Sequence, residues 1–592
     1  MTRDARSPRV RAVFAGAALV GMLGLPTTAS AQPTPSTGTA IESLGSGLDR
    51  LLLGRSWQDT DRGVLVVSMD HGDTLYSVNP DVPLAPASNV KLLTTAAALE
   101  VLGPDYRFLT YLMTDGTVRE DGVLDGDLIL YGTGDPGLSN RFHHRRDAVF
   151  QELLDQLEAS GIREVRGDLV ADASFLPGPL RPTGWDPRDL NDHFTAPISA
   201  LSFNENVVSM RISPAAEVGA PPRVQSIPDH AGLDISNLAQ TVAGARPRVA
   251  ILREEPLAPI RVEGTIGIRA RDAWRQFTVP DPATFAASVF HAALEDRGVE
   301  VSGTVRTVDR PGRSSVPRLS APFAGTRGTK VLARYASDPL RAYLEVINKQ
   351  SHNLFAELVF RTIGRIETNV GSPSASARAV RSALARIGVD TAGIELLDGS
   401  GLSVGNRVTP RQLVEVLDRM AEHPHWNTYW ATLPEAGRAR ELPRMYRTAA
   451  AGNLRAKTGT IERVSALSGV VRTQNGERLA FAIMLNGTPS VARAKAVENQ
   501  IGARLARVER GLGEARAADE QVAASEVSPP ASSGAQRHRI GPGENLTVIA
   551  RQYGISLADL LDANPRVDRN TILAGQWLVI PRNEGEVGVG GG

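Results

Sequence analysis

The chain has 592 residues, 42% of them hydrophobic and 22% charged, with a formal net charge of +0 at pH 7 and no cysteine. This length exceeds that of one ordinary domain, and this composition is typical of a folded globular protein rather than a disordered or fibrous one. The balanced charge argues against a nucleic-acid partner held by a bulk positive field, and the lack of cysteine excludes disulfides, thiol catalysis and cysteine metal sites.

The N-terminus, residues 1–31, has the pattern of a secretory signal peptide. Arginines between Arg3 and Arg11 precede the apolar run VFAGAALVGMLGL, and Ala29-Ser30-Ala31 forms a small-residue cleavage site. The run is shorter than the roughly 20 residues that span a bilayer, which disfavours the alternative of a retained membrane anchor. We therefore expect an exported protein, in a periplasm or cell-wall space, with no permanent transmembrane anchor.

Hydrophobic periodicity near the two ends of the chain predicts helices and strands of one α/β domain. The first group is a helix, a hairpin and a second helix, at 41–53, 63–69 with 74–78, and 88–102. The second group is three helices, three strands and a last helix, at 338–362, 374–387, 410–422, 455–460, 465–473, 478–486 and 491–510. Because Gln474-Asn475-Gly476 is a strong hairpin turn, we expect an antiparallel sheet.

Short strands and Gly/Pro turns separate the two groups. We expect strands at 128–131, 164–172 and 249–252, and a helix at 281–297. The pattern predicts an α/β (α+β) domain of 40–104 and 326–510, β-rich inserted material at 105–325, a linker at 511–537, a compact module at 538–582 and a disordered tail at 583–592.

Lysine is rare in this chain. Lys and Arg together number 65, but lysine occurs only at Lys91, Lys330, Lys349, Lys457 and Lys495. Arginine stays protonated in proteins, whereas a partly desolvated lysine can become a base near neutral pH. The few lysines are therefore candidates for chemistry.

The first candidate motif is Pro86-Ala87-Ser88-Asn89-Val90-Lys91, at the start of the predicted helix 88–102. Ser88 and Lys91 lie one turn apart on the same face. A serine hydroxyl needs an adjacent base to act as a nucleophile, and a helix N-terminus favours a developing oxyanion. Taken alone, the pattern equally fits a capping serine beside a solvated lysine.

The second candidate motif is Ser351-His352-Asn353, which follows Ile347-Asn348-Lys349 at a helix–loop position. Ser351 can relay a proton from Lys91 to a leaving amine, and the Asn353 amide can both donate and accept towards a peptide bond. We assign His352 no role. Taken alone, these are three polar residues before a helix.

The third candidate motif is Lys457-Thr458-Gly459-Thr460, on a strand beside the predicted hairpin. Gly459 would let a substrate backbone lie close to the strand, and the hydroxyls of Thr458 and Thr460 can bind a carboxylate. Lys457 would supply a fixed positive charge. The amides of Thr460 and Ser88 could together form an oxyanion hole. Taken alone, the motif equally fits an ordinary polar edge strand.

The three motifs occur together in one order, and two of the five lysines occupy its lysine positions. This set is an established signature of penicillin-binding proteins and serine β-lactamases. The long segment between Ser88 and Ser351 resembles the two-part insertion of the low-molecular-mass class C penicillin-binding proteins, the penicillin-binding protein four type. Four stretches resemble that family further: GDLILYGTGDPGLS, APISALSFNENVVSMRI, INKQSHNLFAE and DGSGLS.

The resemblance implies a D-alanyl-D-alanine carboxypeptidase/endopeptidase acting on peptidoglycan stem peptides, with β-lactam antibiotics as inhibitors. It implies that Ser88 attacks the carbonyl of the penultimate residue with Lys91 as base. Ser351 and Lys457 would pass a proton to the departing amino acid, and Asn353 would orient the amide. Thr458, Gly459 and Thr460 would bind the substrate's end.

The C-terminal module resembles LysM, a strand–helix–helix–strand unit that binds N-acetylglucosamine-containing glycans. The resemblance rests on GPGENL at 541–546, IARQYGISLADLLDANP and GQWLVIP. It implies glycan contacts at Gly543, Glu544, Asn545 and Leu546, where Glu544-Asn545 replaces the usual Asp-Thr. Such a module would hold the enzyme at the wall by raising its local concentration.

Two other functions use the same residues. A serine β-lactamase shares the three motifs, although the long insertion and wall-binding module argue against it. A non-catalytic peptidoglycan-binding scaffold could retain silent motifs, although the intact Ser88, Lys91 and Lys457 argue against that. We expect no cofactor and no metal, because the chain lacks an H-E-x-x-H signature and His143-His144 has no carboxylate cluster nearby.

Overall fold

The computed structural model describes residues 37–54, 57–229, 231–255, 258–316, 329–510, 536–539, 546–564 and 577–581. The predicted signal peptide, the predicted tail and nearly all of the predicted linker lie outside these residues. The chain divides into two units, residues 1–514 and residues 515–592, and each is described by itself. No helix among the described residues is long and apolar enough to cross a membrane.

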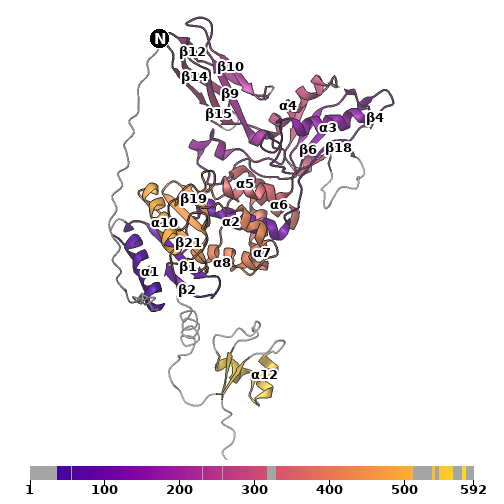
Figure 1. The fold of residues 1–592 in the computed structure, drawn as a ribbon. Coiled ribbons are helices and arrows are strands. Elements are labelled where there is room, and N and C mark those ends of the chain that lie inside the picture. Colours follow the sequence, from indigo (N-terminus) through magenta and orange to yellow (C-terminus); the bar gives the residue numbers. More distant parts are fainter. Residues whose placement is uncertain are drawn as a thin grey trace, which may run out of the picture. The chain divides into compact units, whose positions relative to one another are not determined.

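A five-stranded antiparallel sheet joins the two ends of the first unit (Figure 1). Its order is β19-β20-β21-β1-β2, with β19 at an edge. The bounds are Arg455–Ile461, Val464–Arg472, Arg478–Asn486, Asp61–Ser68 and Thr74–Val78. The pairing of β1 with β21 brings the beginning and the end of this unit into one sheet.

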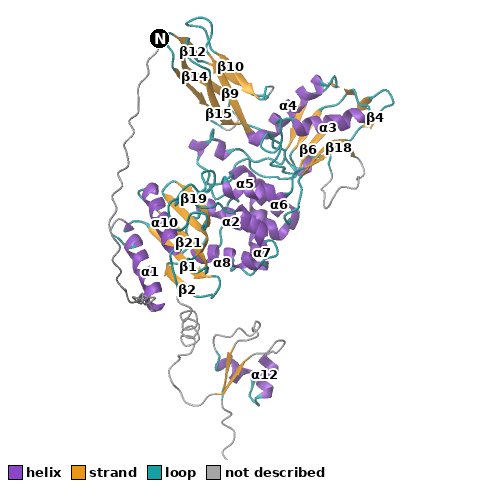
Figure 2. Ribbon diagram, viewed as in Figure 1, coloured by secondary structure: helices purple, strands orange, loops and turns teal. Residues whose placement is uncertain are grey.

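Helices cover both faces of this sheet (Figure 2). Helices α1 (Thr37–Leu52) and α10 (Val491–Leu505) pack their apolar side chains against one face. The other face packs against a helical cluster. Its members are α2 (Val90–Val101), α5 (Leu340–Lys349), α6 (Asn353–Thr368), α7 (Pro373–Arg386), α8 (Pro410–Glu422) and α9 (Trp426–Thr432). The fold class predicted for this part is therefore confirmed.

Two predicted helices differ from those observed, and both differences lie at candidate site residues. The predicted helix 338–362 is two helices, α5 and α6, because Ser351 adopts a left-handed backbone with φ 56°. The predicted helix 88–102 begins with a 3-10 turn, η2 (Ala87–Asn89), before α2 starts at Val90. The side-chain periodicity continues through both irregularities, so it did not reveal them.

The inserted segment forms four further sheets, with α3 (Ala148–Ala159) and α4 (Pro282–Asp296) packed among them. Their orders are β17-β8-β6-β3-β18, β16-β7-β5-β4, β10-β9-β15 and β11-β14-β12 with β13 beside β14. The bounds of β3 to β8 are Leu109–Thr114, Thr117–Val118, Val123–Asp125, Leu128–Gly132, Glu164–Val165 and Leu169–Asp172. Those of β9 to β13 are Val207–Ser213, Arg223–Ile227, Ile235–Asn237, Gln240–Val242 and Pro247–Leu252. Those of β14 to β18 are Ile260–Gly267, Ala273–Thr278, Glu300–Val301, Val305–Val308 and Lys330–Ala336.

Two expectations for the inserted segment need correction. The predicted strand 164–172 is two strands, β7 and β8, which belong to different sheets. Strand β18, which the predicted boundary at residue 325 places outside the insertion, pairs with β3 in the inserted sheet. A single boundary drawn at a composition change cannot register such a long-range pairing.

The second unit is a small strand–helix–helix–strand module. Strand β22 (Gln536–Arg539) pairs antiparallel with β23 (Trp577–Ile580), and α12 (Leu546–Gln552) and α13 (Leu557–Asp562) lie between them in the chain. The module has its own apolar core, which includes Leu546. Gly543, Glu544 and Asn545 lie outside the described residues. The predicted order of elements is confirmed.

Candidate active site

The first motif places a lysine amine against a serine hydroxyl. Lys91 Nζ lies 3.0 Å from Ser88 Oγ, and it also donates to Asn353 Oδ1 at 2.7 Å and to the Ser400 carbonyl at 2.6 Å. The Lys91 side chain is fully buried beneath Ser88, which precedes α2 in the short turn η2. The structure thus joins one residue of the second motif, Asn353, to the first.

The second and third motifs also meet. Lys457 Nζ donates to Ser351 Oγ at 2.9 Å and to the Thr458 carbonyl at 2.9 Å. Asn353 Nδ2 donates to the carbonyl of Phe194, a residue of the inserted segment. The five polar residues proposed from sequence therefore form two hydrogen-bonded groups, Ser88–Lys91–Asn353 and Ser351–Lys457.

The structure shows a packing contact at Gly459 besides the substrate contact proposed from sequence. A Cβ at this position would lie 2.6 Å from the Pro86 carbonyl oxygen and 3.2 Å from the Ser88 amide nitrogen. Glycine therefore lets strand β19 approach the turn that carries Ser88, rather than only making room for substrate. The same strand presents Thr458 half-buried and Thr460 exposed.

A glycine-rich loop outside the three motifs, the DGSGLS stretch at 398–403, completes the lysine pocket. Glu357, one turn after Asn353 on α6, accepts the amides of Gly399 and Ser400 at 2.9 and 2.8 Å. This contact holds the Ser400 carbonyl towards Lys91. Asp398 accepts the Gly401 amide and is itself bound by the indole of an inserted residue, Trp185. Two features of the sequence could have indicated these roles: Glu357 follows Asn353 at helical spacing, and DGSGLS contains turn residues.

Burial makes both lysines candidate proton acceptors. Desolvation lowers the pKa of Lys91 to about 7, and the carboxylates of Asp398 and Glu357 partly oppose that shift. Burial and then the nearby Lys91 lower the pKa of Lys457 well below its usual value. The sequence did not indicate this lowering, because a spacing pattern carries no information on burial.

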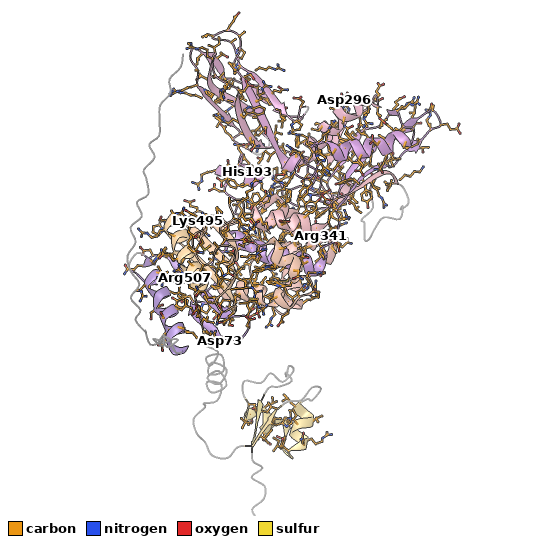
Figure 3. All side chains as sticks on the ribbon, in the orientation of Figure 1. Asp73, His193, Asp296, Arg341, Lys495 and Arg507 are labelled. Carbon is orange, nitrogen blue, oxygen red and sulfur yellow. The ribbon has the colours of Figure 1, made fainter. Side chains whose placement is uncertain are left out.

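A cleft of about 670 Å³ opens over Ser88. Its walls come from the motifs, from the loop after Asp398 and from the inserted segment. They are lined by Ser88, Ser351, Asn353, Thr460, Ile461, Glu462, Leu402, Val404, Gly184, Asp186, Arg188, Asp189 and Phe194. Phe194 belongs to the short helix η4 (His193–Thr195), which packs near α6 and whose His193 is labelled in Figure 3.

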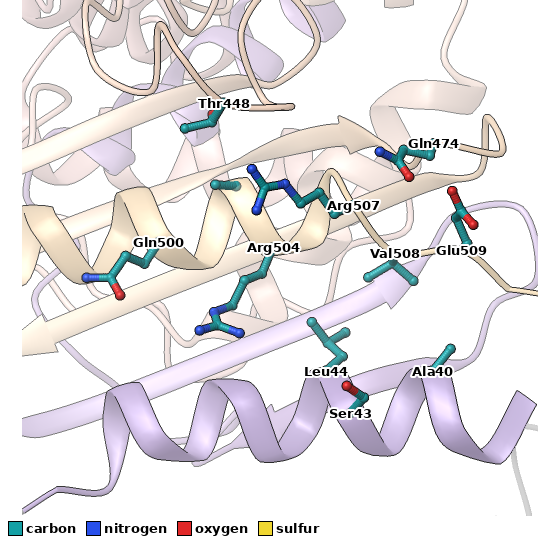
Figure 4. A pocket seen from close by; sticks show the side chains of 11 residues that line it. Ala40, Ser43, Leu44, Thr448, Gln474, Gln500, Arg504, Arg507, Val508 and Glu509 are labelled. Atoms are coloured by element: carbon teal, nitrogen blue, oxygen red, sulfur yellow. The ribbon is translucent and has the colours of Figure 1, made fainter. Parts of the chain in front are cut away.

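A second, larger cavity of about 980 Å³ lies between α1 and α10 (Figure 4). Its lining includes Ser43 and Leu44 of α1 and Arg504 of α10. No motif residue and no lysine lines it. Among the described residues, no group of three or more His, Cys, Asp or Glu could hold a metal ion. The cleft at Ser88 is therefore the candidate active site.

The five-stranded sheet with its helical cluster is a penicillin-binding and β-lactamase-like fold. The structure of this chain is similar to the crystal structure of penicillin binding protein 4 (dacB) from Haemophilus influenzae. The TM-score is 0.64 at 25% sequence identity, and the match covers 78% of this chain and 99% of that chain.

The chain belongs to the D-Ala-D-Ala carboxypeptidase 3 (S13) family, which matches residues 46–508, and residues 538–581 match the LysM domain. It is 37% identical over 506 residues to the D-alanyl-D-alanine carboxypeptidase of Actinomadura sp. (strain R39), covering 83% of this chain and 90% of that protein. It is 26% identical over 439 residues to the D-alanyl-D-alanine carboxypeptidase DacB of Haemophilus influenzae, covering 72% of this chain and 85% of that protein. The predicted family and the C-terminal LysM module are confirmed, and the chain is a hydrolase of the D-Ala-D-Ala carboxypeptidase class.

Proposed function

We propose that this chain is an exported serine D,D-peptidase that cleaves the terminal D-Ala-D-Ala bond of peptidoglycan stem peptides, D,D-crosslinks, or both, through an acyl-enzyme on Ser88. The observation that carries the proposal is the buried Lys91 amine, 3.0 Å from the Ser88 hydroxyl. Since its pKa lies at about 7, this amine is unprotonated in a large fraction of molecules at neutral pH.

In the acylation step, Lys91 Nζ takes the proton of Ser88 Oγ as that oxygen bonds to the carbonyl carbon of the penultimate residue. The amides of Ser88 and Thr460 would stabilise the oxyanion. The C–N bond to the terminal D-amino acid then breaks, and the proton that Lys91 took from Ser88 passes through the hydroxyl of Ser351, which is hydrogen-bonded to Lys457, to the departing nitrogen. Water later attacks the ester, which releases the shortened stem and restores the Ser88 hydroxyl.

Strand β19 would bind the substrate's end. It is the edge strand of the sheet, so a peptide can lie alongside it in extended form. The hydroxyls of Thr458 and Thr460 would hold the terminal carboxylate beside Gly459, and Asn353 would orient the scissile amide. A β-lactam resembles this ligand, so we expect it to leave a slowly hydrolysed ester on Ser88.

Defined muropeptides test this function. The chain without residues 1–31 should remove one alanine from pentapeptides, split crosslinked dimers, or do both, as followed by liquid chromatography and mass spectrometry. The Ser88→Ala variant should do neither, because it lacks the nucleophilic oxygen. The product ratio decides between carboxypeptidase and endopeptidase action. Equal inactivity of both proteins with retained glycan binding would favour the scaffold, and rapid penicillin turnover would favour a β-lactamase.

The rate of Ser88 acylation should depend on pH through Lys91. Below its pKa of about 7 the amine is protonated and accepts no proton, so the rate should rise about tenfold per pH unit below 7 and level off above it. Burial also raises the pKa of the neighbouring Glu357 to about 8, so the measured midpoint belongs to both groups. Stopped-flow measurement with a chromogenic β-lactam checks this. A midpoint near that of an exposed lysine would contradict it.

We also propose that the LysM module tethers the enzyme to the wall. The module has a core of its own, separate from those of the catalytic unit. A chain ending after Arg510 should therefore keep its acylation rate with soluble β-lactam but sediment less with insoluble peptidoglycan. Equal sedimentation of the full and shortened chains would contradict the tether.

We also propose that the chain is exported and that it is divided into a signal peptide, a peptidase, a linker and a LysM module. The signal peptide at 1–31 would be removed on export, and the linker at 511–537 would join the peptidase to its LysM module. Detection of a mature N-terminus near Ala31 in secreted protein, by mass spectrometry, tests the export prediction.

A further inference from the structure

A carboxylate of the inserted segment contacts the histidine between Ser351 and Asn353. His352 Nε2 lies 2.9 Å from Glu205 Oε2. Arg141 donates to the two oxygens of the same carboxylate, at 2.6 and 3.0 Å. The side chains of His352, Glu205 and Arg141 are only 17%, 20% and 30% exposed. The three form a largely shielded cluster at the junction of the insertion and helix α6.

This contact fixes the orientation of the imidazole. His352 caps α6: its Nδ1 accepts the Phe355 amide, and its ring centroid lies 4.2 Å from that of Phe355. Because Nδ1 accepts a hydrogen bond, the ring proton is on Nε2 and points to Glu205. A carboxylate on the second nitrogen is the arrangement that holds a histidine in one tautomer and one rotamer.

Glu205 is held in an unfavourable backbone conformation. Asn204, Glu205 and Asn206 have φ of 50°, 57° and 57°, in the left-handed region that side-chain-bearing residues rarely adopt. The neighbouring side chains stabilise the turn: Asn204 Nδ2 donates to the Val207 carbonyl and Asn206 Nδ2 to the Pro197 carbonyl. Such strain persists where the surrounding structure requires it, commonly at functional sites. Here it directs the Glu205 carboxylate towards His352.

The residues on either side of His352 are the two candidate site residues of the second motif. Ser351 also has a left-handed backbone, with φ 56°, so its hydroxyl depends on how the start of α6 is held. Asn353 Oδ1 accepts the Lys91 amine. A rotation of His352 would move both groups relative to Lys91 and Lys457.

We propose that Glu205, oriented by Arg141, is a positioning residue of the reaction: acting through His352, it holds the Ser351 hydroxyl and the Asn353 amide in the geometry that acylation needs. The inserted segment then helps to position the reacting groups as well as lining the cleft. This inference rests on the proposed acylation of Ser88.

The test measures the acylation rate at saturating fluorescent penicillin, the half-saturating concentration and the thermal unfolding midpoint. Glu205→Ala should lower the saturating rate about tenfold, since small misplacements of reacting groups are costly, with the other two quantities little changed. Glu205→Gln should restore the rate to roughly that of wild type, because its amide oxygen still accepts the Nε2 proton. The matched control is Glu254→Ala, which removes a surface carboxylate of the insertion paired with Arg261 at 2.7 Å.

A double variant separates positioning from mere stability. His352→Asn keeps a good helix cap but loses the partner of Glu205, so it should lower the rate as Glu205→Ala does. Adding Glu205→Ala to His352→Asn should cause no further loss if Glu205 acts through His352. Additive losses, or a wild-type rate in Glu205→Ala, would overturn the proposal.

If Glu205→Ala does not fold, His352→Asn decides alone, and a wild-type rate in it overturns the proposal. A wild-type chain that no penicillin acylates would instead contradict the proposed function. The two failures are therefore distinguishable.

Discussion

Replacing Lys91 with methionine should lower the rate of Ser88 acylation by about 10²–10⁴-fold, the usual contribution of a general base. Methionine has nearly the same length but cannot accept the Ser88 proton. It also leaves the Asn353 Oδ1 and Ser400 carbonyl acceptors without their donor. Because Lys91 is fully buried, loss of the amine removes a desolvated group, and we expect the protein to remain folded. Labelling with fluorescent penicillin over time, beside a thermal unfolding curve, measures both quantities.

Two further variants make this test specific. Lys91→Arg should also be inactive, because a guanidinium stays protonated and cannot act as a base. Lys330→Met removes an exposed lysine of β18 and should acylate like wild type. A Lys91→Met protein that acylates within about tenfold of wild type would show that Ser88 is activated by another group.

Replacing Gly459 with alanine should affect both stability and catalysis. Its Cβ would lie 2.6 Å from the Pro86 carbonyl oxygen and 3.1 Å from the Ala87 Cβ, so β19 must move away from the turn that carries Ser88. Overpacking of this kind typically costs about 1–3 kcal/mol of the free energy of unfolding. Displacement of the strand from Ser88 should lower the acylation rate by roughly 10²-fold. Denaturant unfolding and penicillin acylation measure the two effects.

A matched control is Gly45→Ala in helix α1, where no atom other than the adjoining helix backbone and chain neighbours lies within 4 Å of the added Cβ. It should leave the acylation rate unchanged and stabilise the protein by up to about 1 kcal/mol, because alanine is the better helix former. The result with Gly459→Ala also decides why position 459 is glycine. If this variant kept its full stability and only weakened binding of the stem peptide, the residue would serve the substrate rather than the packing of β19 on the Ser88 turn.

The elements around the candidate site were largely predictable because their signals are local. The spacing of Ser88 and Lys91 belongs to one helical turn, and the Asn475-Gly476 turn defines the β20–β21 hairpin. The cap formed by Thr409 and Gln412 likewise lies within four residues at the start of α8. Such patterns depend on near neighbours in the chain, which the sequence displays directly.

Other features of the site were not predictable, because they depend on residues far apart in the chain. The sequence assigned no role to Glu357, which accepts the Gly399 amide. It also assigned none to Trp185, which donates to Asp398, or to Glu205, which contacts His352. The break between α5 and α6 at Ser351 also escaped the helical pattern. Each feature involves either a contact across the insertion or a backbone conformation imposed by packing.

By itself, then, the sequence determined the three motifs and their order, the strands of the antiparallel sheet, and the strand–helix–helix–strand module that follows. Only the tertiary structure showed that burial lowers the pKa of Lys457, that Gly459 lies against the turn that carries Ser88, and that the inserted segment reaches the second motif. The physical reason is that local structure follows from neighbouring side chains, whereas burial, pKa and close approach of backbones arise only when distant segments pack together.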